Sequence, residues 1–356
     1  MEKRIVIATG GTGGHIFPAT ALAKDLLNSE NPELLFLGGK LSQNPYFNRE
    51  EFDSADIPAA TLSFKKPLAA FQAGRMILQG ILKSRTILKK FSPDLIVGFG
   101  SYYSLPVLAA GLTLKIPIIL HEQNATPGKV NRLFSPFAKR TAITFPESEK
   151  FLKGFCAPTA FPLRFSFSSH LKEEALKYFS LSQNCLTILI VGGSQGAKSI
   201  NALAYKALAG LREELPPFQV IHLTGREGCE RRWEDLEIKA CVKPFETRMD
   251  LAWIAADLAI ARGGASSLSE QIASLTPGII IPYPYATDNH QEKNALYFVN
   301  EISGGILFNE KKGDEKDLSR VICRIVKEVD RFKMNIRDHL EKTRLPTLRE
   351  LILENI

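Results

Sequence analysis

One histidine directly follows a cluster of four glycines in the segment TGGTGGHIFPA, residues 9–19. Glycine-rich backbone at the start of a helix exposes N–H groups that bind anions such as phosphate. His15 falls in the first turn of the expected helix, where the positive end of the helix dipole disfavours a charged imidazolium. Because a neutral imidazole can act as a general base, the segment predicts proton transfer beside a bound anion. A histidine that only caps or packs against the loop is the alternative.

A second glycine-rich segment, VGGSQGAKSINA at residues 191–202, also follows an apolar run and precedes a helical pattern. Neither segment fits the dinucleotide fingerprint GxGxxG. The first would need glycine where Ile16 stands, and the next apolar run ends in FLGG without an acidic residue. Neither carries the GK[ST] of a P-loop. We therefore expect both loops to bind a diphosphate or a sugar phosphate, with a purely structural tight turn as the alternative for each.

Two further apolar runs of the first half end in polar residues. In GFGSYYSLP, residues 98–106, Ser101 and the Gly100 backbone could donate to phosphate, or the segment could be an ordinary turn into a helix. In HEQN, residues 121–124, four polar side chains follow one apolar run. Four in a row at a ligand-binding edge favour substrate contact over a structural network.

The second half offers candidates for sugar recognition. In ARGGASSLSEQIA, residues 261–273, Ser267 and Glu270 have the spacing of a helix capping box. The Glu270 carboxylate could instead accept hydrogen bonds from both hydroxyls of a ribose. The spacing alone does not favour either interpretation. A later polar group supplies partners for sugar hydroxyls: Asp288, Asn289, His290 and Gln291. Trp233 and Trp253 are expected in the core.

A transferase that holds its diphosphate through a metal ion usually carries an Asp-x-Asp pair, and none occurs here. Helix ends together with Arg164 or Arg262 could neutralise a leaving diphosphate instead. We therefore expect no essential metal and no cofactor.

The elements that must position these residues repeat in two halves. Each half opens with an apolar run and a glycine-rich turn, and continues with apolar runs that do not alternate with polar residues. Continuous runs are typical of parallel strands covered by helices on both faces. The sequence thus predicts an α/β protein of two doubly wound domains, linked near TAFPLRFSFSS at residues 159–169. Ligands of such sheets bind at the carboxyl ends of the strands, so the cleft between two such domains is the natural active site.

Composition narrows the class of protein. The chain has 356 residues, 45% of them hydrophobic and 23% charged, and a net charge of +7. This balance is typical of a soluble globular protein with an anionic partner. Five scattered cysteines without a CxxC pair indicate reduced thiols, and no signal peptide or membrane span is expected. The basic residues lie beside apolar rather than aromatic side chains, so nucleic acid is not an expected partner. We expect a cytoplasmic protein.

Taken in order, TGGTGGHIFPA, GFGSYYSLP, HEQN, GGSQGA, RGGAS…SE and DNHQ…NA resemble the MurG family. These peptidoglycan N-acetylglucosaminyltransferases convert lipid I to lipid II, and so serve cell-wall biogenesis, cell shape and cell division. The resemblance implies a GT-B fold, with two Rossmann-like domains facing a central cleft. It places an acceptor- and membrane-binding domain at residues 1–162 and a UDP-GlcNAc-binding domain at 163–339. A C-terminal helix at about 340–356 would pack back on the first domain.

The resemblance also implies roles for particular residues. His15 would be the catalytic base, with Glu270 on the ribose and Arg164 on the donor diphosphate. The substrate-binding set it implies is Thr12, Gly13, Gly14, Asn124, Arg164, Ser194, Phe245, Glu246, Met249, Ala265, Ser266, Ser267, Leu268, Ser269, Glu270 and Gln291. Two positions depart from the family pattern: Phe161 replaces an asparagine, and Ser101 replaces a glycine.

The implied reaction is an inverting transfer from UDP-GlcNAc to the C4 hydroxyl of a polyprenyl-diphosphate-linked muramoyl-pentapeptide. Its lipid acceptor implies a peripheral position on the cytoplasmic face of the bacterial inner membrane, and allows contacts with other cell-wall synthesis proteins. Residues 61–91 carry seven basic residues and no acidic one, with apolar residues between them. Such a segment suits an anionic membrane surface, or is a core-facing helix with a solvated back. The expected contacts are Lys65, Lys66, Arg75, Met76, Ile77, Ile81, Lys83 and Arg85.

Other functions fit parts of the same pattern. A glycolipid glycosyltransferase with another acceptor or a UDP-GlcNAc 2-epimerase would share the fold, although an epimerase needs no basic and apolar segment such as 61–91. A non-catalytic protein that binds nucleotide sugars is the third possibility. Loss of turnover on substitution of His15 separates the enzymes from the binding protein.

Overall fold

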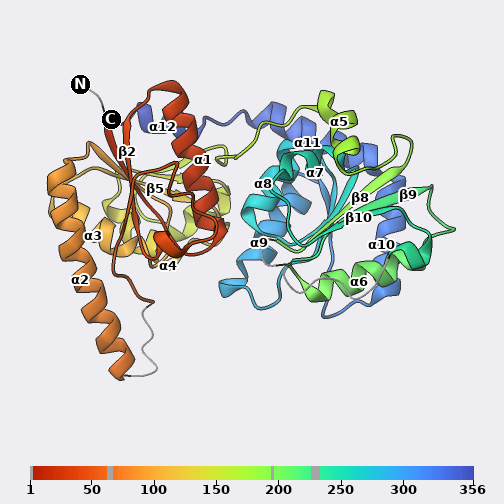
Figure 1. The fold of residues 1–356 in the computed structure, drawn as a ribbon, viewed down its shortest axis with the longest axis horizontal. Coiled ribbons are helices and arrows are strands. Elements are labelled where there is room, and N and C mark those ends of the chain that lie inside the picture. The colour runs from red at the N-terminus through yellow and green to blue at the C-terminus, as the bar shows by residue number, and fades with distance from the viewer. Residues whose placement is uncertain (1–2, 62–66, 194–195, 226–232) are drawn as a thin grey trace. The chain divides into compact units, whose positions relative to one another are not determined.

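The computed structural model describes residues 3–61, 67–193, 196–225 and 233–356. It divides into two compact units (Figure 1). Unit 1 comprises Met1–Arg164 and Leu345–Ile356, and unit 2 comprises Phe165–Arg344. The boundary between residues 164 and 165 lies inside the segment 159–169 that the sequence marks as a linker.

The described strands of unit 1 form a parallel sheet in the order β3-β2-β1-β4-β5-β6-β7. These strands are β1 (Arg4–Ala8), β2 (Glu33–Gly38), β3 (Ser54–Asp56), β4 (Leu95–Gly98), β5 (Ile118–Glu122), β6 (Arg140–Ile143) and β7 (Cys156–Pro158). The chain winds outward in one direction from β1 and in the other from β4. The carboxyl ends of β1 and β4 therefore flank the switch point, where ligands bind in folds of this kind.

Helices cover both faces of this sheet. They are α1 (Gly13–Ser29), α2 (Pro67–Phe91), α3 (Leu105–Thr113), α4 (Lys129–Phe134) and α12 (Leu348–Leu353). Ile5 and Ile7 of β1 pack with α1 and α12 on one face, and Val6 and Ala8 pack with α2 and α3 on the other. Side chains of a strand alternate between faces, so an apolar run buried on both sides fills two cores.

Unit 2 repeats this plan, with the described strands in the order β10-β9-β8-β11-β12-β13. The strands are β8 (Leu186–Val191), β9 (Phe218–Leu223), β10 (Ala240–Lys243), β11 (Leu258–Ala261), β12 (Gly278–Ile280) and β13 (Gly305–Leu307). The helices are α5 (Lys172–Tyr178), α6 (Lys198–Ala209), α7 (Met249–Ala255), α8 (Ala265–Ala273), α9 (His290–Leu296), α10 (Glu315–Lys327) and α11 (Val329–Thr343). Here α6 and α10 pack on one face of the sheet, and α5 and α7 on the other. Trp233 and Trp253 lie in these two cores, as predicted.

The end of the chain differs from the single helix expected over residues 340–356. Its first residues belong to α11, and the helix stops before Pro346, whose ring cannot continue it. Thr347 and Glu350 then form a capping box that starts α12. Leu348, Leu351 and Ile352 pack into the core of unit 1.

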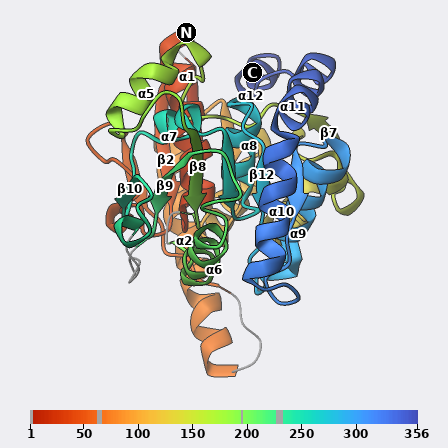
Figure 2. The same ribbon diagram turned by 90° about the vertical axis from the view of Figure 1, so that its right-hand side faces the viewer.

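Helix α2 extends beyond the sheet of its unit in both views (Figures 1 and 2). Its packed face includes Ala73, Ser84 and Leu88. Ile77 falls on this face and is only 9% exposed, so its expected role in membrane contact is wrong; Ile81 is half-buried. The opposite face exposes Leu68, Phe71, Leu78 and Leu82, and Met76 is exposed beside the packed face. Arg75 and Lys83 are also exposed, Arg85 is half-buried, and Lys65 and Lys66 lie outside the described residues.

Among the residues that the structure describes, no helix combines the length and apolar character needed to cross a bilayer.

Candidate active site

The first glycine loop connects β1 to the start of α1. Gly11 has φ +92°, a left-handed conformation, and its carbonyl accepts a hydrogen bond from Asn44 Nδ2 at 2.6 Å. Thr12 is the N-cap residue in extended conformation, and no side chain caps the helix. The first N–H groups of a helix have no partner within it, and the first turn of α1 contains no acidic residue. This end of the helix is therefore suited to an anion.

His15 is held by two contacts of its Nδ1 atom. The carbonyl oxygen of Phe99 lies 2.8 Å away, and the side-chain amide of Gln123 lies 2.7 Å away. A carbonyl oxygen can only accept, so Nδ1 carries the proton and the imidazole lone pair resides on Nε2. An amide turned by 180° would present Gln123 Oε1 as a second acceptor. The half-buried His15 thus has the tautomer that a base acting through Nε2 requires.

Three residues of HEQN are structural, and the prediction of substrate contact is wrong for them. His121, Glu122 and Gln123 are at most 4% exposed. The Glu122 carboxylate accepts from the backbone N–H groups of Asn124 and Gly128, each at 2.9 Å, and so holds the turn after β5. Burial, and then the nearby His15, lowers the pKa of His121 to about 3. Asn124 alone is partly exposed and stays a candidate.

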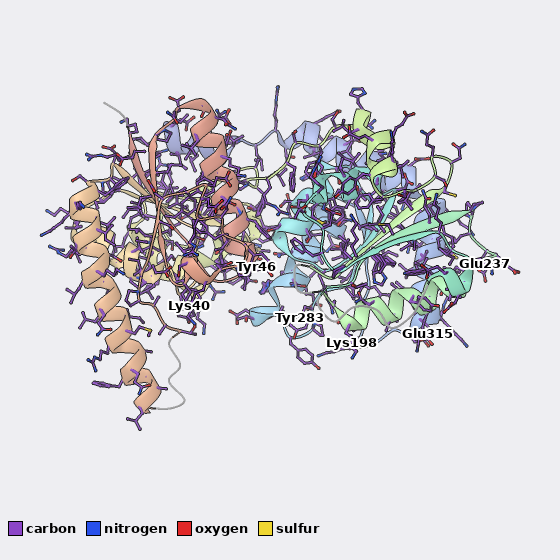
Figure 3. All side chains as sticks on the ribbon, in the orientation of Figure 1. Lys40, Tyr46, Lys198, Glu237, Tyr283 and Glu315 are labelled. Carbon is purple, nitrogen blue, oxygen red and sulfur yellow. The ribbon has the colours of Figure 1, made fainter. Side chains whose placement is uncertain are left out.

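Arg164 lies close to the first glycine loop within unit 1. Its guanidinium carbon is 4.0 Å from the ring centroid of Phe17, two residues after His15. Phe17 also lies near Gly13, where a Cβ would be 2.7 Å from the ring, and near Tyr46, whose ring centroid is 5.3 Å away. Tyr46 is labelled in Figure 3. The arginine charge is thereby placed over the first turns of α1.

The two departures from the family pattern have clear structural consequences. Phe161, in the place of an asparagine, packs edge-on against His121 at 5.8 Å between ring centroids. Ser101, in the place of a glycine, has φ +68°, a region that costs a non-glycine residue about 1–2 kcal/mol. The loop after β4 thus keeps a conformation that glycine adopts without strain.

The second glycine loop lies between β8 and α6, the latter beginning at Lys198 (Figure 3). Gly193 and Gly196 have φ +90° and +80°. Ser194 lies outside the described residues, so its contact with a diphosphate stays a prediction.

Glu270 is not a helix cap. Helix α8 begins at Ala265 with Gly264 as its N-cap residue, and no side chain caps it. The buried Glu270 accepts a hydrogen bond from Trp253 Nε1 at 2.9 Å. The capping-box alternative is therefore wrong, because Ser267 lies inside the helix.

The first turns of α8 contain the other residues of this helix that were expected to contact the UDP-GlcNAc donor. Leu268 is fully buried in a core, so its side chain cannot touch a ligand, and Ser269 is 8% exposed. Ala265 is also buried, whereas Ser266 and Ser267 are half-buried. Besides Glu270, the two half-buried serines and the backbone at the start of α8 remain as candidates on this helix.

The segment expected to contact a base, Phe245–Met249, ends at the start of α7. Glu246 accepts from Lys243 Nζ at 2.7 Å, the Arg248 N–H at 2.8 Å and Tyr178 Oη at 3.1 Å. Burial alone would raise the pKa of Glu246, but the hydrogen bonds and the Lys243 charge lower it. Its carboxylate therefore shapes the turn, while Phe245 is 48% exposed.

Arg262 cannot neutralise a leaving diphosphate, which was one of the two alternatives that the sequence left open. It is 6% exposed and pairs with Glu310 at 2.7 Å. It also donates to Ser199 at 2.9 Å and to the carbonyls of Ile281 and Pro282. These bonds fix the start of α6 to the sheet.

Gln291 lies in the first turn of α9. Its Oε1 accepts from the Tyr283 N–H at 2.9 Å, which orients the amide; Tyr283 is labelled in Figure 3. Gln291 is half-buried. It remains a candidate for sugar hydroxyls.

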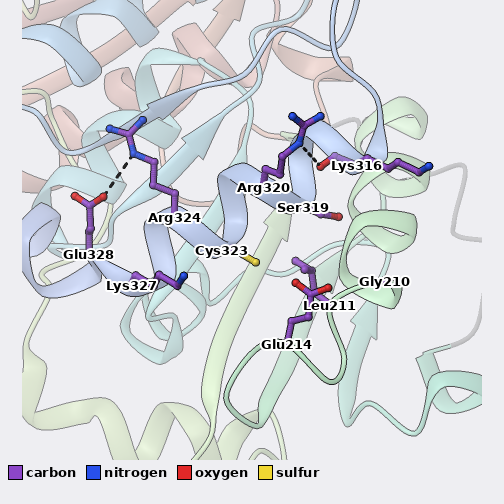
Figure 4. A pocket seen from close by; sticks show the side chains of 10 residues that line it. All are labelled: Gly210, Leu211, Glu214, Lys316, Ser319, Arg320, Cys323, Arg324, Lys327 and Glu328. Atoms are coloured by element: carbon purple, nitrogen blue, oxygen red, sulfur yellow. Dashed lines mark hydrogen bonds and ion pairs between the residues drawn. The ribbon is translucent and has the colours of Figure 1, made fainter.

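A groove of about 800 Å³ lies at the other end of α6, between Gly210 and the face of α10 (Figure 4). Its basic side chains are Lys316, Arg320, Arg324 and Lys327. Arg320 pairs with Asp317 and Arg324 with Glu328, so neighbouring acids offset much of the charge. The groove does not adjoin the glycine loop, which precedes the first turn of α6.

Within the described ranges, no group of three or more His, Cys, Asp or Glu residues could hold a metal ion. The described cysteines carry free thiols; Cys229 lies outside the described residues.

Comparisons with known proteins agree with this geometry. The models of the glycosyltransferase family 28 N-terminal and C-terminal domains match residues 5–143 and 187–347. A UDP-N-acetylglucosamine--N-acetylmuramyl-(pentapeptide) pyrophosphoryl-undecaprenol N-acetylglucosamine transferase of Protochlamydia amoebophila (strain UWE25) is 42% identical, over 99% of this chain and 96% of that protein. The enzyme of the same name from Chlamydia pneumoniae is 38% identical, over 88% and 87%.

Solved structures show the same fold. Acinetobacter baumannii MurG matches with a TM-score of 0.73 and 25% identity, over 95% of each chain. Phytolacca americana UGT2 matches with a TM-score of 0.68 and 14% identity, over 95% of this chain and 94% of that one. The predicted α/β architecture of two Rossmann-like domains and the resemblance drawn from the motifs are both confirmed. The chain belongs to glycosyltransferase family 28 and, within it, to the peptidoglycan N-acetylglucosaminyltransferases of the MurG family.

Proposed function

We propose that this chain transfers N-acetylglucosamine from UDP-GlcNAc, with inversion, to the C4 hydroxyl of a polyprenyl-diphosphate-linked muramoyl-pentapeptide. The names of its relatives support the transferred sugar and the acceptor class. The observation that carries the mechanism is the 2.8 Å contact between His15 Nδ1 and the Phe99 carbonyl oxygen, from which the tautomer of His15 follows.

His15 is the general base of this mechanism. Its Nε2 takes the proton of the C4 hydroxyl as that oxygen attacks C1 of GlcNAc. The bond between C1 and the diphosphate oxygen breaks, and its electron pair leaves with UDP. Attack opposite the leaving group converts an α-linked donor into a β-1,4 product. A positioned base of this kind contributes about 10²–10⁴-fold to the rate.

Unit 1 holds the acceptor in this proposal. The backbone N–H groups at Thr12, Gly13 and Gly14 bind the acceptor diphosphate, and Asn124 contacts the sugars. Support comes from the uncapped start of α1 and from the absence of an acidic residue in its first turn. Arg164, stacked on Phe17, supplies positive charge for the donor diphosphate as it leaves.

Unit 2 holds the donor. We assign the diphosphate to the second glycine loop with Ser194, the ribose to Glu270, and the GlcNAc hydroxyls to Gln291. The backbone of Phe245–Met249 would face the uracil, and the start of α8, including Ser266 and Ser267, would line the nucleotide site. The buried carboxylate of Glu270, oriented by Trp253, supports the ribose assignment because a fixed carboxylate can accept from two neighbouring hydroxyls.

Helix α2 places the enzyme at the membrane in this proposal. Leu68, Phe71, Leu78 and Leu82 are spaced so that they share one exposed stripe of the helix, with Arg75 among them. An apolar stripe flanked by basic residues suits the interface of an anionic leaflet, which is where a polyprenyl-linked acceptor lies. The protein would therefore be peripheral on the cytoplasmic face of the inner membrane.

The test is release of UDP from UDP-GlcNAc with and without a soluble lipid I analogue, in the wild type and in His15→Asn. Release that depends on the acceptor and is lost in the variant supports both the transferase and the base. Acceptor-dependent release that survives in the variant overturns the role of His15. Release without acceptor would favour an epimerase or hydrolase, and bound UDP-GlcNAc without turnover would favour a binding protein.

A further inference from the structure

Three buried side chains of unit 2 form a chain of hydrogen bonds that ends behind the second glycine loop. Trp233 Nε1 donates to His222 Nδ1 at 3.2 Å, and His222 Nε2 lies 3.1 Å from Asn201 Oδ1. Asn201 Nδ2 donates to the carbonyl oxygen of Thr224 at 2.8 Å. Trp233 and His222 are fully buried, and Asn201 is 2% exposed.

The chain of bonds has one direction. The indole N–H can only donate, so His222 Nδ1 must accept and the imidazole proton must lie on Nε2. That proton fixes the oxygen of the Asn201 amide toward His222 and its NH₂ group toward Thr224. A doubly protonated imidazole would set two N–H groups against each other at Nδ1. Burial lowers the pKa of His222 to about 4, so the neutral form is retained at neutral pH.

The Thr224 carbonyl lies directly against the glycine loop. A Cβ on Gly196 would be 2.5 Å from this oxygen and 2.6 Å from Gly225 Cα, so only glycine allows the contact. Thr224 and Gly225 are also hydrogen-bonded to the end of β10 and to the residue that follows it. The N–H groups of Thr224 and Gly225 donate to the carbonyls of Lys243 and Pro244 at 2.9 and 3.0 Å.

We propose that His222 is a positioning residue for the donor nucleotide. Through Asn201 it fixes the Thr224 carbonyl, and thereby sets the spacing between the diphosphate loop and the segment at Phe245–Met249 that faces the base. The inference rests on the proposed binding of UDP-GlcNAc to unit 2. It predicts that loss of the chain weakens donor binding without a matching effect on acceptor binding.

The experiment compares His222→Leu with His222→Gln, whose amide can both accept from Trp233 and donate to Asn201. Gln219→Leu is the matched control. Gln219 is buried on the same strand β9 but at the opposite end of that strand, where it forms hydrogen bonds with Ser182 and Thr187. Calorimetry measures the Kd of UDP, and steady-state kinetics measure KM for UDP-GlcNAc and for a soluble lipid I analogue. Tryptophan fluorescence checks folding.

We expect His222→Leu to raise the Kd of UDP and the KM for UDP-GlcNAc about tenfold, and the acceptor KM less than about twofold. His222→Gln should regain most of the affinity, and Gln219→Leu should lose stability only. Equal donor affinity in His222→Leu and in Gln219→Leu would overturn the inference. If His222→Leu does not fold, Asn201→Ala, which cuts the last link, must show the same loss. A wild-type protein that binds no UDP-GlcNAc would instead refute the proposed function.

Discussion

The Nδ1 atom of His15 lies 2.8 Å from the carbonyl oxygen of Phe99. His15 belongs to the first turn of α1, and Phe99 directly follows β4. Strands β1 and β4 are the two central neighbours from which the chain winds in opposite directions. At this switch point the Phe99 carbonyl, which follows β4, therefore lies next to His15, the candidate base, which follows β1.

His15→Asn tests the base independently of this contact. The asparagine amide can still donate to the Phe99 carbonyl, but it has no basic nitrogen. We expect kcat to fall about 10²–10⁴-fold while the KM for UDP-GlcNAc changes little. His15→Ala is the comparison, because it loses the hydrogen bond as well and should be the less stable of the two. Activity of His15→Asn close to that of the wild type would contradict the assignment.

Gln123→Glu should move the pH dependence of the reaction. A carboxylate near Nδ1 stabilises the imidazolium and raises the pKa of His15. Because the unprotonated base is the active form, the acid limb of the kcat/KM profile should shift to higher pH by about one unit. Gln123→Met removes the hydrogen bond without adding charge and should leave that limb in place. Identical profiles for the Glu and Met variants would show that Gln123 does not act through His15.

Much of the fold was predictable because burial on both faces leaves a continuous apolar run. The continuous apolar runs of the two halves, such as IVIA at residues 5–8 and ILIV at residues 188–191, correspond to β1, β2, β4, β5, β8, β9, β11 and β12. The strands that it did not reveal are short, such as β3 and β7 with three half-buried or exposed residues each. A strand of three residues carries too little periodicity to be distinguished from a loop.

The site was less predictable where a role depends on distant residues. In the sequence, His222 cannot be distinguished from the other residues of a buried strand, because its partners Asn201 and Trp233 belong to other elements. The spacing of Ser267 and Glu270 could not show that α8 begins at Ala265, two residues before Ser267, with Gly264 as its N-cap residue. Leu68 and Phe71 could have been found, because residues 68, 71, 75, 78 and 82 recur at helical spacing.

Glu270→Gln separates ligand binding from stability in unit 2. The glutamine oxygen can still accept from Trp253, so the melting temperature should hardly change. Loss of the charged acceptor should weaken UDP binding about tenfold, measured by calorimetry. Ser267→Ala should leave stability unchanged, because Gly264 is the N-cap residue. Unaltered UDP affinity in Glu270→Gln would reject the ribose assignment.

The double variant Phe71→Asp, Leu78→Asp should detach the protein from membranes. Both side chains are more than half exposed on α2, and insertion of each contributes about 1.5–3 kcal/mol. We expect binding to vesicles with anionic phospholipids to fall more than about tenfold, measured by co-sedimentation, with activity on a soluble acceptor retained. Met334→Asp on α11 is the control, since Met334 is 56% exposed on another helix. Equal loss in the control would mean that the stripe on α2 is not the docking surface.

The stability of unit 2 should depend on pH through His222. Its pKa is about 4 in the folded state, lowered by burial, and about 6.5 in the unfolded chain. Between these two pH values the unfolded state therefore binds more protons than the folded state. The free energy of unfolding of unit 2 consequently falls as the pH falls, by about 1.4 kcal/mol per pH unit. In His222→Gln this loss is absent, so the stability difference from the wild type should be constant above pH 7 and should shrink between pH 6.5 and 4.

Urea titrations followed by tryptophan fluorescence can measure this difference, because both tryptophans, Trp233 and Trp253, lie in unit 2. The pKa of His339 is also lowered by burial, but that residue is common to both proteins and cancels in the comparison. For Gln219→Leu the difference from the wild type should not vary with pH. If the curves of His222→Gln and the wild type run parallel from pH 7 to 4, His222 does not stay neutral in the folded protein, and the one-directional chain to Thr224 cannot hold.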